Sequence, residues 1–292
     1  MSHSVLTKIE DNYLDLSKSH KRIADYVLAN YEKAAFLTAA KLGEETGISV
    51  STVVRFATSL GYEGYPEFQD ALRETIKGKL TSTQRIEVAG TQIRDNDLLG
   101  TILQKDSEMI RSTMAEVDPD AFDKASKAIN KARRIYIVGV RSSAALANFM
   151  YFYFNLIYDD VRLLSSNSSS EMFEDIYRIG PEDVCVALSF PRYSKHVLRV
   201  VSYAGERGAK TIAITDHADS PIAEVADYTL VAKSNMVSFI DSLVAPLSLV
   251  NALIVSSARG SKTAVRRKLA ELEEIWEKFD IYKNMEEDDR AE

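Results

Sequence analysis

Cysteine is almost absent from this chain of 292 residues, and its scarcity limits what kind of protein the sequence can encode. The single cysteine, Cys185, can form no disulfide within the chain, and no Cys/His cluster has the spacing of a metal site. No apolar run approaches the roughly 18–20 residues of a transmembrane helix, and the N-terminus lacks a signal-peptide pattern. We therefore expect a cytoplasmic protein with no membrane segment, metal centre or other cofactor.

Basic charge is also scarce. The net charge is −7, and residues 1–80 contain ten Lys and Arg against eleven Asp and Glu. If this segment binds nucleic acid, it needs locally placed cations and dimerisation to reach a useful affinity. The hydrophobic content of 46% and the charged content of 27% are ordinary for a globular protein. The length is sufficient for two domains, each with its own core.

Residues 38–60 carry the most informative pattern, which predicts two short helices joined by a turn at Gly47 and Ile48. Ser49 is the expected N-cap of the second helix. At about 100° per residue, the apolar side of that helix consists of Val50, Val53, Ala57 and Leu60. The opposite side consists of Ser51, Arg55 and Ser59, flanked by Thr52 and Thr58. A small polar face with one arginine suits the major groove of DNA, although an ordinary helix pair with a solvated face has the same pattern.

The surrounding sequence predicts a compact domain of four or five helices. Ile23, Val27 and Tyr31 recur at helical spacing after Ser19, the expected N-cap, and a further helix is expected over 67–77. Base contacts are expected from Ser49, Ser51, Thr52 and Arg55, and contacts near the DNA backbone from Lys18, Lys21 and Arg22. Residues 81–97 are polar and weakly patterned, which indicates a linker or a poorly patterned helix.

From residue 133 onward the pattern changes to short β-branched apolar runs that alternate with helices. Strands are expected over 133–140, 160–165, 182–190, 209–216 and 227–233, and helices around 143–157, 169–178, 194–208 and 239–258. Nearly continuous apolar strands are typical of a parallel sheet covered on both faces, and short helical crossovers predict a right-handed doubly wound α/β fold. Such folds bind ligands at the carboxyl ends of their strands.

Hydroxyl and guanidinium groups gather at these expected strand ends. The candidate ligand-binding residues are Arg141, Ser142 and Ser143 after the first strand, and Ser189, Arg192 and Ser194 after the third. Helix N-termini with free N–H groups and hydroxyls suit an anion such as phosphate, although serine also caps helices with no ligand present. Either arginine could pair with a phosphate bidentately, and the serine-rich run 165–171 could add contacts to a sugar.

Two sets of segments resemble a known family. RIADYVLAN, AAKLGEETGISVSTVVRF and LGYEGYPEF resemble the helix-turn-helix domain of the RpiR family of bacterial transcriptional regulators. VGVRSSAALA, SFPRYSKH and GAKTIAITDHADSPIAEVADYTL resemble its sugar isomerase (SIS) domain. The resemblance implies a dimeric regulator that binds a DNA operator and senses a sugar phosphate. It also implies that the phosphate-contacting serines are Ser142, Ser143, Ser189 and Ser194.

The expected organisation is therefore an all-helical DNA-binding domain over 1–80, a linker over 81–97 and an SIS-type five-stranded domain over 98–292. The last domain would include a C-terminal helix and the acidic tail MEEDDRAE. The helix within 262–279 has an apolar face that would pack on its own domain or on a partner chain. That face consists of Leu269, Leu272, Ile275, Trp276 and Phe279.

Four positions depart from the family pattern. Arg141 stands where many SIS domains have glycine, and bulky residues follow the third strand where a Ser-Gly-Glu type of turn is common. His196 replaces a common glutamate, and Gly43 replaces an alanine in the helix-turn-helix, at a cost of roughly 0.5–1 kcal/mol of helix stability. We interpret the chain as a ligand-responsive regulator without catalytic residues.

Two alternatives remain open from the sequence. A sugar-phosphate isomerase would need a base near the bound sugar, for which His196, Glu171 and Glu206 are the candidates. A sensor for a ligand without phosphate could instead pair a carboxylate with Arg141.

Overall fold

The computed structural model describes residues 5–76, 83, 85, 97–166, 168–236, 240–260 and 262–282. The chain forms two compact units, one of residues 1–101 with 236–241 and the other of residues 102–235 with 242–292. Apart from Thr83, Arg85 and Asp97, the expected linker over 81–97 lies outside the described residues, as does the acidic tail. No helix in the described part is long and apolar enough to cross a membrane.

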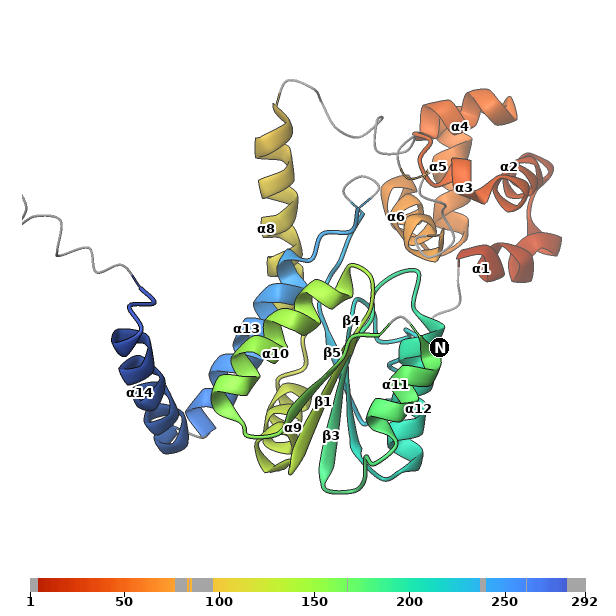
Figure 1. The fold of residues 1–292 in the computed structure, drawn as a ribbon. Helices are drawn as coiled ribbons and strands as arrows, with labels where there is room; N and C mark the ends of the chain where they lie inside the picture. Colours follow the sequence, from red (N-terminus) through yellow and green to blue (C-terminus); the bar gives the residue numbers. More distant parts are fainter. Residues whose placement is uncertain are drawn as a thin grey trace, which may run out of the picture. The chain divides into compact units, whose positions relative to one another are not determined.

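Short helices build the described part of the first unit up to residue 76 (Figure 1). They are α1 (Val5–Asn12), a 3-10 turn (Tyr13–Asp15), α2 (Lys18–Ala29), α3 (Tyr31–Ala34), α4 (Ala39–Thr46), α5 (Val50–Ser59) and α6 (Tyr65–Ile76). This segment therefore contains six α-helices, where the sequence predicted four or five. The prediction of Ser19 as an N-cap is wrong, because the Ser17 hydroxyl accepts the bond from the backbone N–H of His20, at 3.3 Å.

The core of this unit lies between α2, α4, α5 and α6, where Ile23, Leu42, Phe56 and Phe68 are fully buried. The rings of Phe56 and Phe68 meet edge to face, with centroids 5.7 Å apart. Gly43 lies where α4 meets the following turn, and a Cβ there would be 2.6 Å from the carbonyl oxygen of Ile48. The absent side chain therefore permits this close approach, in addition to its cost in helix propensity.

Five parallel strands form the centre of the second unit, and all five expected strands are confirmed. They are β1 (Arg134–Gly139), β2 (Val161–Leu164), β3 (Asp183–Leu188), β4 (Lys210–Thr215) and β5 (Tyr228–Val231). Their order is β2-β1-β3-β4-β5, with β1 between β2 and β3. The register pairs Gly139 at the end of β1 with Leu188 at the end of β3. These two strands therefore finish side by side.

Helices cover both faces of this sheet (Figure 1). The helices of the unit are α8 (Leu98–Glu116, which begins in the first unit), α9 (Pro119–Lys131), α10 (Ser143–Ile157), α11 (Ser169–Ile176), α12 (Lys195–Glu206), α13 (Val244–Gly260) and α14 (Lys262–Lys278). One apolar core lies between the sheet and α9, α10 and α13, and another between the sheet and α11 and α12. Cys185 lies in the second core, where burial raises the pKa of its thiol to about 12.

Charged pairs fix the edge of the sheet at which the strands begin. Arg133 donates two hydrogen bonds, of 3.0 and 2.8 Å, to the fully buried carboxylate of Asp183. Asp227 accepts hydrogen bonds of 2.9 and 3.0 Å from the backbone N–H and hydroxyl of Thr211, and one of 2.9 Å from Lys210. These contacts stabilise the amino edge, whereas the opposite edge presents the loops that follow the strands.

The apolar face expected on the C-terminal helix is only partly covered. Leu269, Leu272 and Trp276 are half-buried, whereas Ile275 and Phe279 are 49% and 65% exposed. Helix α14 packs against α10 and α13, and its Val265 lies against the core of the α/β unit. The remaining apolar surface is available to a further partner.

Candidate functional sites

The two helices of the predicted DNA-binding motif are α4 and α5, and the turn between them is the one expected. Thr38 caps α4 by accepting a bond from the backbone N–H of Lys41, at 3.2 Å. The helix ends at Gly47, whose φ of 65° is a left-handed conformation that glycine adopts without strain. Arg22 of α2 donates a 2.7 Å hydrogen bond to the carbonyl of Thr46 in the last turn of α4. Arg22 thus joins α2 to this turn.

Helix α5 buries Val53, Phe56 and Ala57, and its C-cap residue Leu60 is also buried. The prediction that Val50 belongs to the buried apolar side is wrong, because this residue lies in the first turn of the helix and is 47% exposed. The sequence analysis also missed Phe56, although its spacing of three residues from Val53 places it on the same face.

The opposite face of α5 carries a network of hydroxyl groups and one arginine. The hydroxyl oxygen of Ser49 lies 3.1 Å from that of Ser51 and 2.9 Å from that of Thr52. Arg55 donates a 3.2 Å hydrogen bond to the Thr52 hydroxyl. Ser49 occupies the N-cap position, but its side chain makes no capping bond to the backbone. Ser51 and Arg55 are exposed, so the face is accessible to a macromolecule.

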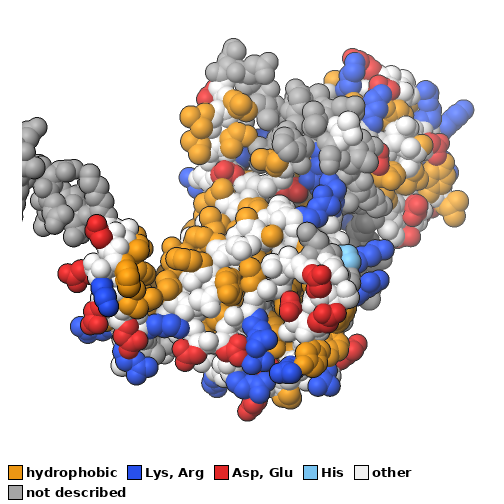
Figure 2. Space-filling view, viewed as in Figure 1, with side chains coloured by type: hydrophobic (Ala, Val, Ile, Leu, Met, Phe, Trp, Pro, Cys, Tyr) orange, Lys and Arg blue, Asp and Glu red, His pale blue; other side chains and the backbone are white. Residues whose placement is uncertain are grey.

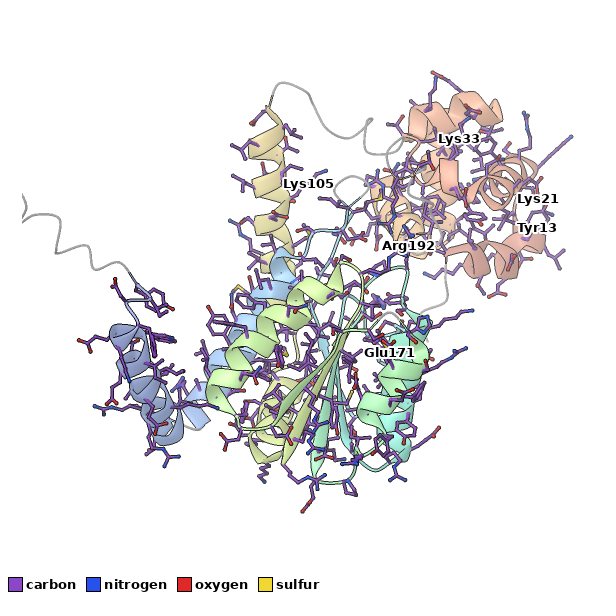
Figure 3. All side chains as sticks on the ribbon, viewed as in Figure 1. Tyr13, Lys21, Lys33, Lys105, Glu171 and Arg192 are labelled. Atoms are coloured by element: carbon purple, nitrogen blue, oxygen red, sulfur yellow. The ribbon has the colours of Figure 1, made fainter. Side chains whose placement is uncertain are left out.

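Positive charge is concentrated around this face. Residues 17–22 and 49–59 together contain Lys18, Lys21, Arg22 and Arg55 and no acidic residue. The ammonium of Lys21 donates to the carbonyl of Leu14, at 3.1 Å, and lies 5.6 Å from the ring centroid of Tyr13 (Figure 3). Helix α2 packs against α5, so the segments that carry these cations are neighbours in the fold.

His20 is a neighbour of this surface that sequence reasoning missed. Its ring meets Phe56 edge to face, with centroids 5.6 Å apart. Partial burial and the positive charge of Arg55 lower the pKa of the His20 imidazole. A lone histidine in a polar run gives no indication of such a contact in the sequence.

The predicted anion site lies at the carboxyl ends of β1 and β3. Ser142 is exposed at the start of α10 and makes no capping bond, whereas Ser143 is only 5% exposed. Ser189, directly after β3, is 3% exposed. Ser194 caps α12 by accepting a 3.2 Å bond from the backbone N–H of His196. The register of β1 and β3 thus brings together the two loops that carry the four predicted serines.

Both predicted arginines of this site have unusual backbone conformations. The φ angles are 56° for Arg141 and 68° for Arg192, and both residues are exposed. Gly139 explains how the first loop can be so tight. A Cβ at Gly139 would lie 2.8 Å from the carbonyl oxygen of Ser143 and 3.0 Å from Cβ of Ala147. Strand β1 therefore closely approaches the start of α10.

Two acidic residues lie at this edge, and Glu206, a predicted base, lies far from it. Asp216, directly after β4, is 4% exposed and accepts a 2.8 Å hydrogen bond from the Tyr193 hydroxyl, a contact that the sequence did not predict. Glu171, in the first turn of α11, accepts a hydrogen bond from Ser166 (Figure 3). Glu206 ends α12, about 18 Å along the helix from Ser194 at a rise of 1.5 Å per residue. The prediction of Glu206 as a base near the site is therefore wrong.

This edge is chemically suited to an anion. The N-termini of α10 and α12 supply N–H groups and positive dipole ends beside the serine hydroxyls. No cluster of His, Cys, Asp or Glu within the described residues could hold a metal ion. The arrangement therefore offers hydrogen bonds and positive charge.

Together, the helix-turn-helix unit and the α/β unit define a class of protein, a DNA-binding regulator with a sugar isomerase type of domain. Residues 3–79 match the helix-turn-helix domain of the rpiR family, and residues 128–256 match the SIS domain. A helix-turn-helix type transcriptional regulator of Haemophilus influenzae is 30% identical over 79% of this chain and 80% of its own length. The chain belongs to the RpiR family of transcriptional regulators.

Other relatives agree with this membership. A Clostridium perfringens helix-turn-helix type regulator is 26% identical over 77% of this chain and 80% of its own length. The sugar isomerase domain of an RpiR transcription factor from Sphaerobacter thermophilus is 28% identical, with a TM-score of 0.58, over 61% of this chain and 99% of that domain. The Vibrio vulnificus NanR protein complexed with ManNAc-6P has the same fold, with 21% identity and a TM-score of 0.56 over 96% of this chain and 100% of NanR.

Proposed function

We propose that this RpiR-family regulator binds its operator through α5 and changes its DNA occupancy when a phosphorylated sugar or a related anionic metabolite binds the α/β domain. The observation that carries the proposal is the presence, in one chain, of the cations on α2 and α5 and of a serine-rich strand edge. The proposed domains are residues 1–80 and 98–292, joined by a linker over 81–97.

DNA recognition is assigned to the polar face of α5. Ser51, Thr52 and Arg55 contact base edges, and the bond from Arg55 to Thr52 restricts the guanidinium before DNA arrives. Such restriction reduces the side-chain entropy lost on binding. Lys18 and Lys21 lie near phosphates, whereas Arg22 is engaged with the carbonyl of Thr46.

The effector is assigned to the edge between the loops after β1 and β3. Its phosphate accepts bonds from Ser142, Ser143, Ser189 and Ser194 and from the N–H groups that begin α10 and α12. The NanR relative complexed with ManNAc-6P supports a phosphorylated ligand of this class. To change DNA occupancy, the ligand must bind two arrangements of the DNA-binding domains with affinities that differ by about 1–3 kcal/mol.

A homodimer is part of the proposal. Phe152 of α10 and Val255 of α13 are 61% and 59% exposed, and apolar side chains gather over α10 and along α14 (Figure 2). Exposed Ile275 and Phe279 extend this surface. Contact between two copies would bury it and present two α5 helices to half-sites separated by whole turns of DNA.

We also propose that the chain does not catalyse sugar isomerisation. The site has His196 where a glutamate is common in SIS domains, and Glu171 is hydrogen-bonded to Ser166. An assay of the full chain with aldose and ketose phosphates tests this point. Reproducible isomerisation that is lost in a His196→Ala or Glu171→Gln variant would favour the enzyme instead.

The DNA-binding proposal is tested by selecting bound duplexes from a random pool with the full chain, followed by affinity measurements on the selected sequence. Arg55→Ala should weaken binding to that sequence by about 1–3 kcal/mol, or roughly 5- to 150-fold, because one base contact is removed. Its thermal stability should hardly change, since the side chain is exposed.

Arg207→Ala is the matched control, because it removes an exposed arginine at the far end of α12. It should leave DNA affinity unchanged. Unfolding as the main effect of Arg55→Ala, or equal losses in both variants, would contradict the assignment of α5 to the groove.

A further inference from the structure

A buried carboxylate lies beside the proposed effector site, at the end of the neighbouring strand. Asp216 directly follows β4 and is 4% exposed. Strand β4 pairs with β3 in parallel, and the backbone N–H of Ser189 continues this pairing by donating a 3.1 Å bond to the carbonyl of Ile214. Asp216 and the loop that begins at Ser189 therefore leave the sheet from adjacent strand ends.

A hydrogen bond joins Asp216 to the far end of that loop. The hydroxyl of Tyr193 donates to Oδ1 of the Asp216 carboxylate, at 2.8 Å. Tyr193 directly precedes Ser194, the N-cap of α12. A hydrogen bond from a hydroxyl to a carboxylate is stronger than one between neutral groups, and a buried carboxylate is costly to leave without donors. The bond therefore holds the end of the loop at which α12 begins.

Packing holds the other end of the loop. Ser189 is 3% exposed, and the next residue, Phe190, is 6% exposed and belongs to the apolar core on the α9, α10 and α13 side of the sheet. Ser189 and Ser194 are thus each adjacent to an anchored aromatic side chain. A loop that is fixed at both ends loses little conformational entropy when a ligand binds to it.

We infer that Tyr193 and Asp216 are positioning residues for the proposed effector site. Their hydrogen bond holds Ser194 and the N–H groups at the start of α12 where a phosphate is bound together with Ser189. This inference rests on the proposed effector site. Asp216 acts here as a hydrogen-bond acceptor, and its negative charge opposes the binding of a nearby anion. Its presence beside an anion site is therefore explained by the position of the loop and not by attraction of the ligand.

Inorganic phosphate is the probe, because it carries the group that the loops are proposed to hold and requires no knowledge of the sugar. Its dissociation constant for the full chain is measured by phosphorus NMR line broadening at constant ionic strength, and the melting temperature of each variant is measured without phosphate. Tyr193→Phe, which removes only the hydroxyl, should weaken phosphate binding at least about fivefold, because the loop is no longer held for the ligand.

Asp216→Leu should weaken phosphate binding to a similar extent. The double variant Tyr193→Phe/Asp216→Leu should lose no more affinity than either single variant, because both changes remove the same hydrogen bond. Asp216→Asn removes the charge but keeps an acceptor for Tyr193, so it should recover most of the affinity that Asp216→Leu loses.

Tyr203→Phe is the matched control for the loss of a tyrosine hydroxyl. Tyr203 donates a 3.2 Å hydrogen bond to the carbonyl of Tyr177. It lies roughly 13–14 Å along α12 from Ser194, at a rise of 1.5 Å per residue. This variant should leave the phosphate affinity unchanged.

Three results would overturn the inference. An unchanged phosphate affinity in Tyr193→Phe would make the bond a purely structural one, whatever the melting temperature. The proposed effector site would still stand if Ser142→Ala with Ser143→Ala weakened phosphate binding. An affinity of Asp216→Asn as low as that of Asp216→Leu would show that the acceptor is not what matters. Failure of the unaltered chain to bind phosphate at millimolar concentration would count against both the inference and the proposed effector site.

Discussion

Replacing Arg22 with alanine separates two roles that the sequence could not distinguish. One is a contact to a DNA phosphate, and the other is a stabilising hydrogen bond within the protein, between α2 and the end of α4. Its guanidinium donates a 2.7 Å bond to the Thr46 carbonyl. It also lies 3.0 Å from where a Cβ on Gly47 would be, over the turn between α4 and α5. The structure therefore predicts that Arg22→Ala acts mainly on stability.

The magnitude follows from the contact. A hydrogen bond from a charged donor contributes about 1.5–3 kcal/mol when well shielded, and the exposure of Arg22 lowers this to about 1 kcal/mol. For a domain of this size, 1 kcal/mol corresponds to a decrease of roughly 4–8 °C in melting temperature. Amide hydrogen exchange in α2 and α4 is the appropriate assay, because the single tryptophan, Trp276, lies in the other unit.

The DNA side of the experiment needs no operator. The affinity of the full chain for an arbitrary duplex is measured between 50 and 200 mM salt, and each lost phosphate contact reduces the slope of log K against log salt by about 0.9. Arg22→Ala should preserve the slope, whereas the matched variant Lys18→Ala should reduce it and leave hydrogen exchange unchanged. If Arg22→Ala reduced the slope of log K against log salt and left amide hydrogen exchange unchanged, the structural role of Arg22 would be refuted.

Two further predictions concern the α/β unit. Ser142→Ala with Ser143→Ala should abolish the response of DNA binding to a sugar phosphate and leave DNA binding itself intact; an unaltered response in a competition assay would place the effector elsewhere. Burial by itself raises the pKa of the Asp227 carboxyl. Hydrogen bonds from Lys210 and Thr211 lower this pKa by a larger amount, so the net pKa is below its ordinary value. The resulting stability is present above the unfolded pKa of about 4 and is lost as pH falls through the folded value, so Asp227→Asn should destabilise the chain at pH 7 and flatten its acid unfolding curve.

Periodicity and turn chemistry predicted most of the fold correctly. All five strands follow from short apolar runs, since a parallel sheet covered on both faces needs continuous apolar character. The errors occur at helix ends, where one residue decides the outcome. Ser17 and Ser19 are equally good caps by type, and only the path of the chain after Leu16 selects Ser17. Val50 is exposed because it lies in the first turn of α5.

The site was predictable to the extent that strand ends in a parallel sheet must share an edge. That rule brought Ser142, Ser143, Ser189 and Ser194 to neighbouring loops. The bond from Tyr193 to Asp216 was not predictable, because it joins loops after different strands through the direction of one side chain. The conformation of Arg141 was predictable only in part. The resemblance puts glycine at its position, and the positive φ shows that the chain keeps the glycine backbone while adding a charged side chain.

Local pairing explains how an acidic chain can present a surface for DNA. Glu45 accepts bonds from Lys33 at 2.8 Å and from Tyr26 at 3.1 Å, and Asp70 accepts one from Arg73 at 3.0 Å. These acids are therefore paired with neighbouring side chains. Within the described residues, by contrast, neither Lys18 nor Arg55 belongs to an ion pair.

The number of cationic side chains near phosphates sets how strongly salt should weaken DNA binding. With Lys18 and Lys21 near phosphates in each protomer, the proposed dimer makes about four such contacts, and the slope of log K against log salt should be about −4. Such a slope is modest for a DNA-binding protein, since the lac repressor value is about −10. Electrostatics alone therefore gives weak binding, and in the proposed dimer the occupancy of an operator depends on base contacts and on both protomers binding together. In the proposed dimer, an effector that changes the alignment of the two half-site contacts would therefore change DNA occupancy without disturbing either α5 helix.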